Sequence, residues 1–284
     1  MNHQLRSTFF GGKVKQIQKY DEDGFLILPG LIRPEEVAAL SAEVDRLKTI
    51  KASPCIKFER NGNIRMILRM HEQEGDTASP EMRALSRLPR LLGPAKQMLR
   101  DRDVYVYHTK LNLKPAFEGT IWAWHQDFGT WKRDGVVNPN IVTALVMLDQ
   151  AEEMGGALYF VPGSHRLGSL DHIEDEGVGA LNKNSVRRDL LAQCMEARKP
   201  VPVVGPPGTV AIFHSNVVHG SGHNMSSRDR RQMYVVYNPV TNKPEAVPDP
   251  RPDQLCSLNQ IPIDMVSDDA ILAAAAAHNE LAVH

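Results

Sequence analysis

The sequence has few cysteines, almost no net charge and no long apolar run. Its three cysteines, Cys55, Cys194 and Cys256, are too scattered for a disulfide framework or a zinc cluster, which favours a reducing cytoplasm. No segment reaches the roughly 18 consecutive apolar residues of a membrane-spanning helix, and no apolar run follows a basic start. The formal net charge of -1, with both signs interspersed, gives no reason to expect nucleic acid or an anionic membrane as a partner. We therefore expect a soluble, cytoplasmic protein.

The first hundred residues are expected to be mostly helical with one strand. The apolar run from 24 to 30 is bounded by glycines and predicts a buried strand. Residues 34–48 begin with proline and two acids and repeat apolar residues at helical spacing, so they predict an amphipathic helix. Another helix is expected over about 80–100, with an interruption near Pro89.

From Val104 the chain turns into short β-like runs separated by turn residues. Such a succession predicts a sandwich or barrel. A long insert over 168–201 holds a predicted helix around 185–198, and loops of this length are commonly lids or binding elements. The β-like runs are 104–113, 120–125, 141–148, 157–161, 209–213 and 233–237.

The tail from Ser267 predicts a capped, alanine-rich helix. The sequence contains no internal repeat and no low-complexity linker, so we expect one domain over residues 1–284. Its expected parts are a helical support over about 1–100, a β core over about 104–240, a lid insert over about 168–201 and a C-terminal helix over about 267–281.

The stretch 120–131, TIWAWHQDFGTW, holds all three tryptophans together with His125 and Asp127. Residues two apart on a strand share a face, so this imidazole and this carboxylate could bind one metal ion. A lone pair of this kind is usually an ordinary structural feature. His219, which follows a later β-like run and precedes a Gly-Ser-Gly turn, is the strongest candidate for the third ligand. Two histidines and one carboxylate form the facial triad that holds non-haem Fe(II) and leaves adjacent positions open.

An arginine follows the third ligand at a spacing that suits a carboxylate anchor. Arg230 stands eleven residues after His219. Its planar guanidinium can bind a carboxylate through two hydrogen bonds, and the hydroxyl of Ser221 could assist it. The open metal positions would accept a bidentate 2-oxo acid and dioxygen. Arg228 and Arg231 remain weaker candidates for the same anchor.

Five ordered motifs carry a resemblance to a known family. The sequence resembles the phytanoyl-CoA dioxygenase superfamily of Fe(II)/2-oxoglutarate oxygenases, and within it the bacterial hydroxylases of free proline and leucine and the ectoine hydroxylases. The motifs span most of the chain. They are RLLGPA at 90–95, WHQDF at 124–128, FVPGSH at 160–165, HGSGHNMS at 219–226 and PRP at 250–252.

The resemblance implies an all-β core with flanking helices, a cupin-like double-stranded β-helix or jelly roll. It assigns His125, Asp127 and His219 to the metal and catalytic centre. It assigns Arg230 to the distal carboxylate of 2-oxoglutarate, accompanied by Ser221. Asn112 and His108 are expected beside the same co-substrate, although the relatives usually carry glutamine where His108 stands.

For the substrate, the resemblance points to an aromatic wall and a cation. Trp131 and Phe128 are expected to wall the pocket, whereas Trp122 and Trp124 are expected to pack the sheet behind the iron. Arg251 matches the position that grips a substrate carboxylate in leucine-type enzymes. Leu68, which lies in a segment where this chain departs from the family pattern, is a further expected substrate contact.

Together these features predict a dioxygenase that uses Fe(II), 2-oxoglutarate and O2 to hydroxylate an unactivated C–H bond. Asp127 favours hydroxylation, or another oxidation driven by the same iron centre, because halogenating relatives replace this carboxylate with a small residue. The expected substrate is a small carboxylate-bearing molecule, a free or modified amino acid. Two alternatives stay open: tailoring of a larger natural product, and a non-catalytic jelly roll that binds or senses through a metal. Neither nucleic acid nor membrane is expected as a partner, and the N-terminal helices could support a homodimer.

Overall fold

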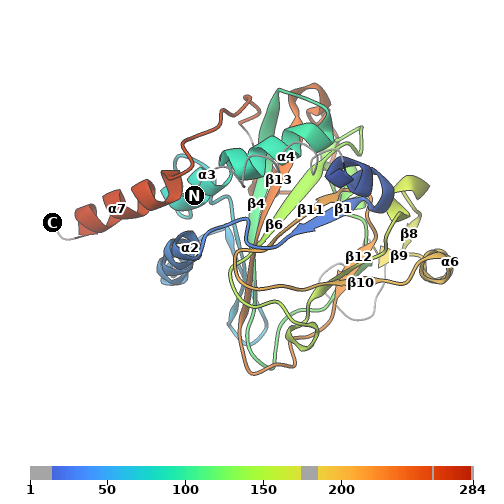
Figure 1. The fold of residues 1–284 in the computed structure, drawn as a ribbon, viewed down its shortest axis with the longest axis horizontal. Helices are drawn as coiled ribbons and strands as arrows, with labels where there is room; N and C mark the ends of the chain where they lie inside the picture. Colours follow the sequence, from blue (N-terminus) through green and yellow to red (C-terminus); the bar gives the residue numbers. More distant parts are fainter. Residues whose placement is uncertain (1–14, 174–184, 258, 283–284) are drawn as a thin grey trace.

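Two antiparallel β-sheets face each other, and helices cover the outer face of the larger sheet (Figure 1). The structure, a computed structural model, describes residues 15–173, 185–257 and 259–282. This arrangement is a jelly roll, as the sequence predicted. Among the described residues, no helix combines the length and apolar character needed to cross a bilayer.

The larger sheet has seven strands and carries most of the chain's β-structure. Its two central strands, β13 and β4, are also its longest, and they lie side by side in an antiparallel ladder. In spatial order the strands are β1 (Phe25–Leu28), β11 (Val210–His214), β6 (Val142–Met147), β13 (Arg230–Pro239), β4 (Val104–Lys114), β3 (Ile64–Leu68) and β2 (Ile56–Phe58).

The smaller sheet has six short strands, and its centre pairs β12 with β5. The two sheets bury apolar side chains between them, including Phe160 from the smaller sheet and Phe213 from the larger one. In spatial order its strands are β10 (Val201–Val203), β7 (Leu158–Phe160), β12 (His219–Ser221), β5 (Trp122–His125), β9 (Ser185–Val186) and β8 (His172–Ile173).

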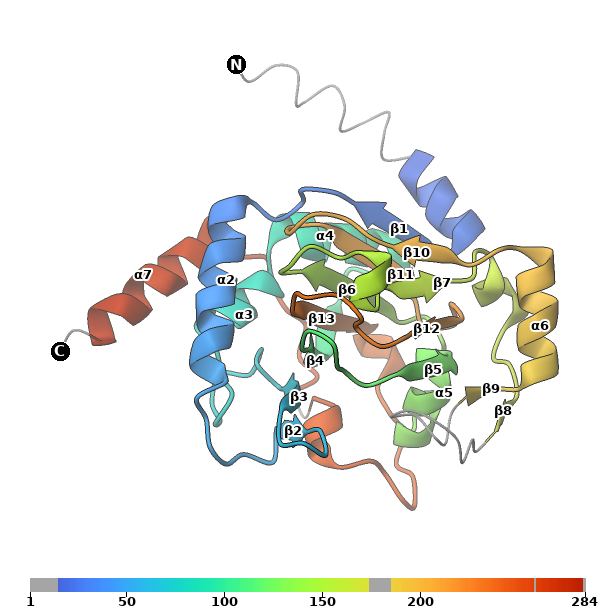
Figure 2. The same ribbon diagram turned by 90° about the horizontal axis from the view of Figure 1, so that it is seen from below.

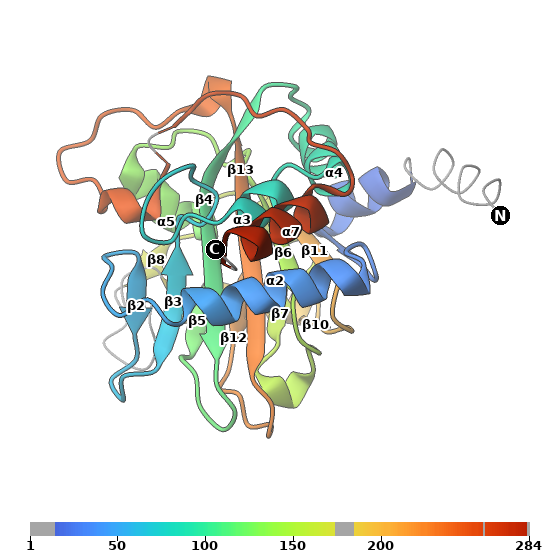
Figure 3. The ribbon, with the colours of Figure 1, turned by 90° about the vertical axis from the view of Figure 1, so that its left-hand side faces the viewer.

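Four helices lie across the outer face of the seven-stranded sheet (Figures 1 and 3). Each of the first three begins with proline, whose fixed φ and missing N–H suit the first turn of a helix. A separate helix, α6 (Arg188–Ala197), lies at the end of the molecule remote from α7 (Figure 2). The four covering helices are α2 (Pro34–Leu47), α3 (Pro80–Leu85), α4 (Pro89–Leu99) and α7 (Ala270–Ala282).

A β-bulge in β4 changes which residues face the smaller sheet. Val106 pairs with Tyr237 and His108 pairs with Val236, so Tyr107 is an extra residue without a partner on β13. Residues of a regular strand alternate between faces, and an inserted residue shifts that alternation by one. Tyr107 packs with residues of the inner face, and from His108 onward the even-numbered residues face inward.

The structure departs from the sequence expectation at two places. The first hundred residues contain the hairpin β2–β3 as well as β1. This hairpin was not predicted, because its two short runs mix apolar and charged residues and lack a clear strand pattern. In the insert over 168–201, residues 174–184 lie outside the described residues. The helix expected around 185–198 begins at Arg188, after the short strand β9. The role of this insert as a lid stays a prediction.

Candidate metal and co-substrate site

Three potential metal ligands meet between the sheets. His125 ends β5 and pairs in register with His219, the first residue of β12. The chain then leaves the sheet, and Asp127 opens the short helix α5 (Asp127–Trp131). The expectation that His125 and Asp127 share one strand is therefore wrong, although their side chains converge. The Nε2 atoms of His125 and His219 lie 3.7 Å and 3.8 Å from the Asp127 carboxylate oxygens, and the three ligand atoms all lie within 4.8 Å of one another.

Main-chain carbonyls orient both imidazoles. Nδ1 of His125 lies 2.6 Å from the carbonyl oxygen of Ala123, and Nδ1 of His219 lies 2.9 Å from that of Val217. A carbonyl only accepts hydrogen bonds, so each Nδ1 carries a proton and each Nε2 faces the space that it shares with the Asp127 carboxylate. Two nitrogens and one oxygen on one side of a common point fit Fe(II) and leave its other positions open.

The charge states of these groups also suit a metal. Burial favours a higher pKa for Asp127, but the neighbouring His219, His125 and Lys110 outweigh it and hold that pKa below its usual range. Burial, reinforced by His125, lowers the pKa of His219 to about 4. At neutral pH the carboxylate is ionised and this imidazole is neutral, which are the forms that coordinate a metal.

Arg230 is a buried cation without a carboxylate partner in the described part of the chain. Its side chain is 1% exposed, and its Nε and Nη2 atoms have no hydrogen-bond partner there. Nη1 donates to the side-chain oxygen of Gln232. A buried, unpaired guanidinium is costly in the free protein, so this position is built for an anionic ligand. The distal carboxylate of 2-oxoglutarate fits this requirement.

Two lysines on β4 place their amino groups on the same inner face. Lys114 pairs in register with Arg230 and donates to Ser221, at 2.9 Å from its Oγ, and to the carbonyl of Gly222. Burial and the charge of Arg230 lower the pKa of Lys114 to about 6. The ammonium of Lys110 lies 5.2 Å from the ring centre of Trp122 and lines the cavity in front of the triad.

Three polar residues of this inner face were not predicted from the sequence: Lys110, Lys114 and Tyr234, the last of which also lines the cavity. A usable signal existed, because His108, Lys110, Asn112 and Lys114 put a polar residue at every second position of an otherwise apolar strand. Such alternation indicates a strand with one polar face. Tyr234 gives no comparable signal, since a tyrosine in a predicted buried strand is an ordinary core residue.

The structure brings several expected residues to this cavity. Asn112 and Ser221 line it, and the side-chain oxygen of Asn112 has no partner within the described residues. Leu68 is buried on β3 and pairs in register with Lys110, so it faces the same side. The hydroxyl of Ser221 accepts a hydrogen bond from Lys114.

The tryptophans are arranged differently from the expectation. Trp122 lines the cavity rather than packing behind the iron, and Trp124 packs on the other side against a small apolar cluster. Phe128 and Trp131 are buried in a cluster with Tyr107. The register of β5 against β12 shifts between Trp122 and His125, which breaks the strand alternation on which the expectation for the two tryptophans depended.

Arg251, expected to grip a substrate carboxylate, is paired with a carboxylate of the protein. Its Nε lies 2.6 Å from Oδ1 of Asp134, and its Nη2 donates to the other oxygen of the same group. Asp134 lies in a short 3₁₀ helix (Lys132–Asp134) that directly follows α5. The pair is largely buried, so the guanidinium charge that was expected to bind a substrate carboxylate is already paired with Asp134.

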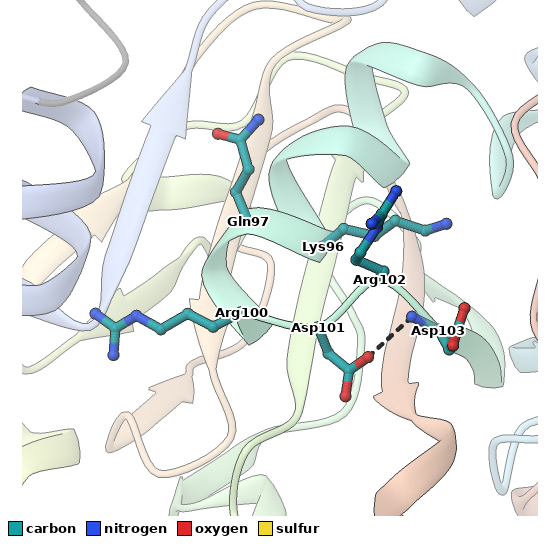
Figure 4. A pocket seen from close by; sticks show the side chains of 6 residues that line it. All are labelled: Lys96, Gln97, Arg100, Asp101, Arg102 and Asp103. Carbon is teal, nitrogen blue, oxygen red and sulfur yellow. Dashed lines mark hydrogen bonds between the residues drawn. The ribbon is translucent and has the colours of Figure 1, made fainter.

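A larger hollow lies at the C-terminal end of α4, lined by residues 96, 97 and 100–103. Its charged side chains point apart rather than toward a common centre, and the one hydrogen bond drawn joins Asp101 to the backbone N–H of Asp103 (Figure 4). Charges that diverge at an open surface do not define a ligand. This hollow therefore lacks the converging polar groups found in the cavity at the triad.

Comparisons with known proteins agree with this geometry. The profile of the family described as Phytanoyl-CoA dioxygenase (PhyH) matches residues 20–232. An ectoine dioxygenase of Nocardia farcinica is 32% identical, covering 88% of this chain and 86% of the relative. An L-proline trans-4-hydroxylase of Streptomyces griseoviridis is 30% identical, covering 89% and 96%. The crystal structure of EctD from S. alaskensis with 2-oxoglutarate and 5-hydroxyectoine superimposes with a TM-score of 0.76 at 30% identity, covering 88% and 85%.

Proposed function

The chain belongs to the phytanoyl-CoA dioxygenase family and is a dioxygenase that uses Fe(II) and 2-oxoglutarate, and we propose that it hydroxylates a free or modified amino acid. The relatives named for ectoine and for L-proline support a small substrate of this kind. The observation that carries the proposal is the His125–Asp127–His219 triad in one cavity, on the inner face that also carries the unpaired Arg230.

Each group has a defined task in this proposal. His125, Asp127 and His219 would hold Fe(II), which together with 2-oxoglutarate and O2 supplies the oxidising power to break an unactivated C–H bond. Arg230 would bind the distal carboxylate of 2-oxoglutarate. The cavity wall keeps water away from the reacting centre, and its lining combines the apolar surfaces of Trp122 and Leu158 with the ammonium of Lys110.

We also propose a cytoplasmic location and no nucleic-acid or membrane partner. The three cysteines are all free, as expected in a reducing compartment. The surface of the N-terminal helices is where a homodimer would form. Size-exclusion chromatography with light scattering would test the dimer.

The test is succinate formation from 2-oxoglutarate after anaerobic Fe(II) loading and admission of air. The panel contains the twenty amino acids, ectoine and N-acyl amino acids. We expect coupled turnover with one member, lost in His125→Ala because one of three metal ligands is removed. His223→Ala is the matched control, since His223 follows His219 closely in sequence but is exposed, and its loss should leave turnover unchanged. Slow turnover unaffected by every member would contradict an amino-acid substrate, and absence of succinate under all conditions would contradict the oxygenase assignment.

A further inference from the structure

His108 directly follows the β4 bulge, so its side chain lies on the same inner face as Lys110 and Asn112, which line the cavity. Its Nδ1 lies 3.0 Å from the carbonyl oxygen of Leu255, far along the chain. Its ring meets that of Trp131 edge-on, with 5.9 Å between ring centres and 87° between planes. Next to it on the same face is Lys110, which lines the cavity. The carbonyl and the indole hold the imidazole in one orientation.

This arrangement decides which ring nitrogen carries the proton. The Leu255 carbonyl only accepts, so Nδ1 of His108 donates. Burial, with the charges of Lys110 and Arg251, lowers the pKa of His108 to about 3, so the ring is neutral. Nε2 carries no proton and can therefore only accept a hydrogen bond. Among the described residues, the one hydrogen bond of this ring is made by Nδ1. A glutamine could either donate or accept at this place, whereas His108 can only accept.

The Leu255 carbonyl is itself held in place by a buried ion pair. Arg251 binds both oxygens of Asp134, and Asp134 also accepts a hydrogen bond from the hydroxyl of Tyr107. A second attachment follows where the backbone N–H of Ser257 donates to the Tyr107 carbonyl at 2.5 Å. The segment 251–257 is thus held at its first residue by Asp134 and at its last residue by Tyr107, which directly precedes His108.

We propose that the Arg251–Asp134 pair is a clamp that positions Leu255, and that His108, oriented by this clamp, accepts a hydrogen bond from an N–H or O–H group of the substrate. The inference rests on the proposed function and narrows it. The substrate carries an amine, amide or hydroxyl donor, and Arg251 acts as a positioning residue whose carboxylate partner is Asp134.

The tautomer can be measured without any substrate. Nitrogen-15 NMR of the histidine side chains, in protein loaded with Zn(II) and 2-oxoglutarate, reports which ring nitrogen is protonated. The His108 signals are those that disappear in His108→Gln. We expect protonated Nδ1 and unprotonated Nε2 in the wild type, and a mixture of tautomers in Arg251→Gln and Asp134→Asn. A protonated Nε2 in the wild type, or a tautomer unchanged in both clamp variants, would overturn the proposal.

Kinetics tests the contact with the substrate, with L-proline and ectoine as the probes. We expect His108→Leu to raise KM for the probe about 10- to 100-fold, as for loss of one buried hydrogen bond that leaves a donor unpaired. His108→Gln should recover most of this loss, because its amide oxygen accepts. The 2-oxoglutarate Kd, titrated anaerobically, should stay unchanged. An increase in that Kd with unchanged KM would assign His108 to the co-substrate instead.

A double-mutant cycle separates the clamp from direct capture of a substrate carboxylate. In the clamp, Arg251→Gln acts through His108, so the KM of the double variant with His108→Leu should not exceed that of His108→Leu alone by more than about twofold. Asp134→Asn should reproduce the effect of Arg251→Gln. If Arg251 held the substrate itself, the two effects would multiply and Asp134→Asn would not mimic them. Wild-type protein that binds no 2-oxoglutarate would instead refute the proposed function, independently of these variants.

Discussion

At the scale of single residues, the burial of Arg230 is the strongest indication that the ligand carries a negative charge. A guanidinium that is 1% exposed and has no carboxylate partner among the described residues weakens the free protein. A ligand carboxylate relieves that cost, so binding and stability are linked at this position. The triad differs from Arg230, because its buried carboxylate and imidazoles suit a cation rather than an anion.

The residue-scale prediction concerns Arg230→Gln. We expect KM for 2-oxoglutarate to rise by roughly two orders of magnitude, since one partner of a buried charge pair is lost, at a cost of about 2–5 kcal/mol. The free protein should unfold at the same or a higher temperature, because an unpaired buried cation has been removed. Arg228→Gln is the matched control, as Arg228 is exposed two residues away. A fall in Tm with unchanged KM would contradict the assignment.

The chemistry was easier to predict from sequence than the surroundings of each group. Short family motifs predict His125, Asp127 and His219, whose ligand atoms the fold brings together, and the spacing from His219 predicts Arg230, which is buried. The partner of Arg251 could not be found this way. Asp134 lies 117 positions away and belongs to no motif, so only the folded chain brings the two together.

At the scale of elements, helices and strands were predicted correctly where apolar residues repeat at one regular spacing, or run continuously, through the whole segment. Helices α2, α3 and α4, the proline that separates α3 from α4, and strands β1, β4, β6 and β13 all occur where expected. The short strands β2, β8, β9, β10 and β12 were missed, because two or three residues show no measurable alternation. The β4 bulge was missed for a related reason: a single extra residue alters the facing of side chains without altering composition.

The element-scale prediction concerns helix α7, which packs against α2 and α3. Ile271 on this helix is fully buried, and Nδ1 of His278 lies 3.0 Å from Oε1 of Glu81 on α3. Ile271→Ala should lower the free energy of unfolding by about 2–5 kcal/mol, through lost burial and the cavity left behind. Leu272→Ala, which removes a partly exposed neighbour, should cost clearly less.

Urea unfolding measures both α7 variants. Anaerobic 2-oxoglutarate titration should give the same Kd for them as for the wild type, because α7 lies on the outer face of the larger sheet, away from the cavity. A changed Kd would show that α7 communicates with the site, contrary to its expected role as a purely structural cover.

At the scale of the whole molecule, burial of neutral histidines makes stability depend on pH. Burial, with nearby arginine charges, lowers the pKa of His71 from 6.5 to about 3, and burial likewise lowers the pKa of His108 to about 3. Between about pH 6.5 and about pH 3, both histidines bind a proton in the unfolded chain but stay neutral in the folded chain. The free energy of unfolding must therefore fall as the pH is lowered, by up to about 1.4 kcal/mol per pH unit for each such histidine.

The corresponding measurement is urea unfolding of metal-free protein, kept free with a chelator, between pH 7.5 and pH 4.5. We expect the unfolding midpoint to move to lower urea as the pH falls below about 6.5. His71→Gln should reduce the slope, because it removes one of the titrating groups. His223→Gln, at an exposed histidine, is the control. A flat profile in the wild type would contradict the burial of neutral imidazoles.

The orientation of His125 and His219 by the main-chain carbonyls of Ala123 and Val217 has a consequence for how this protein can change over evolutionary time. No side-chain substitution at 123 or 217, other than one that bends the backbone, removes the group that aims each imidazole. Substitutions at these two positions can thus change the packing behind the metal ligands while both imidazoles keep their orientation.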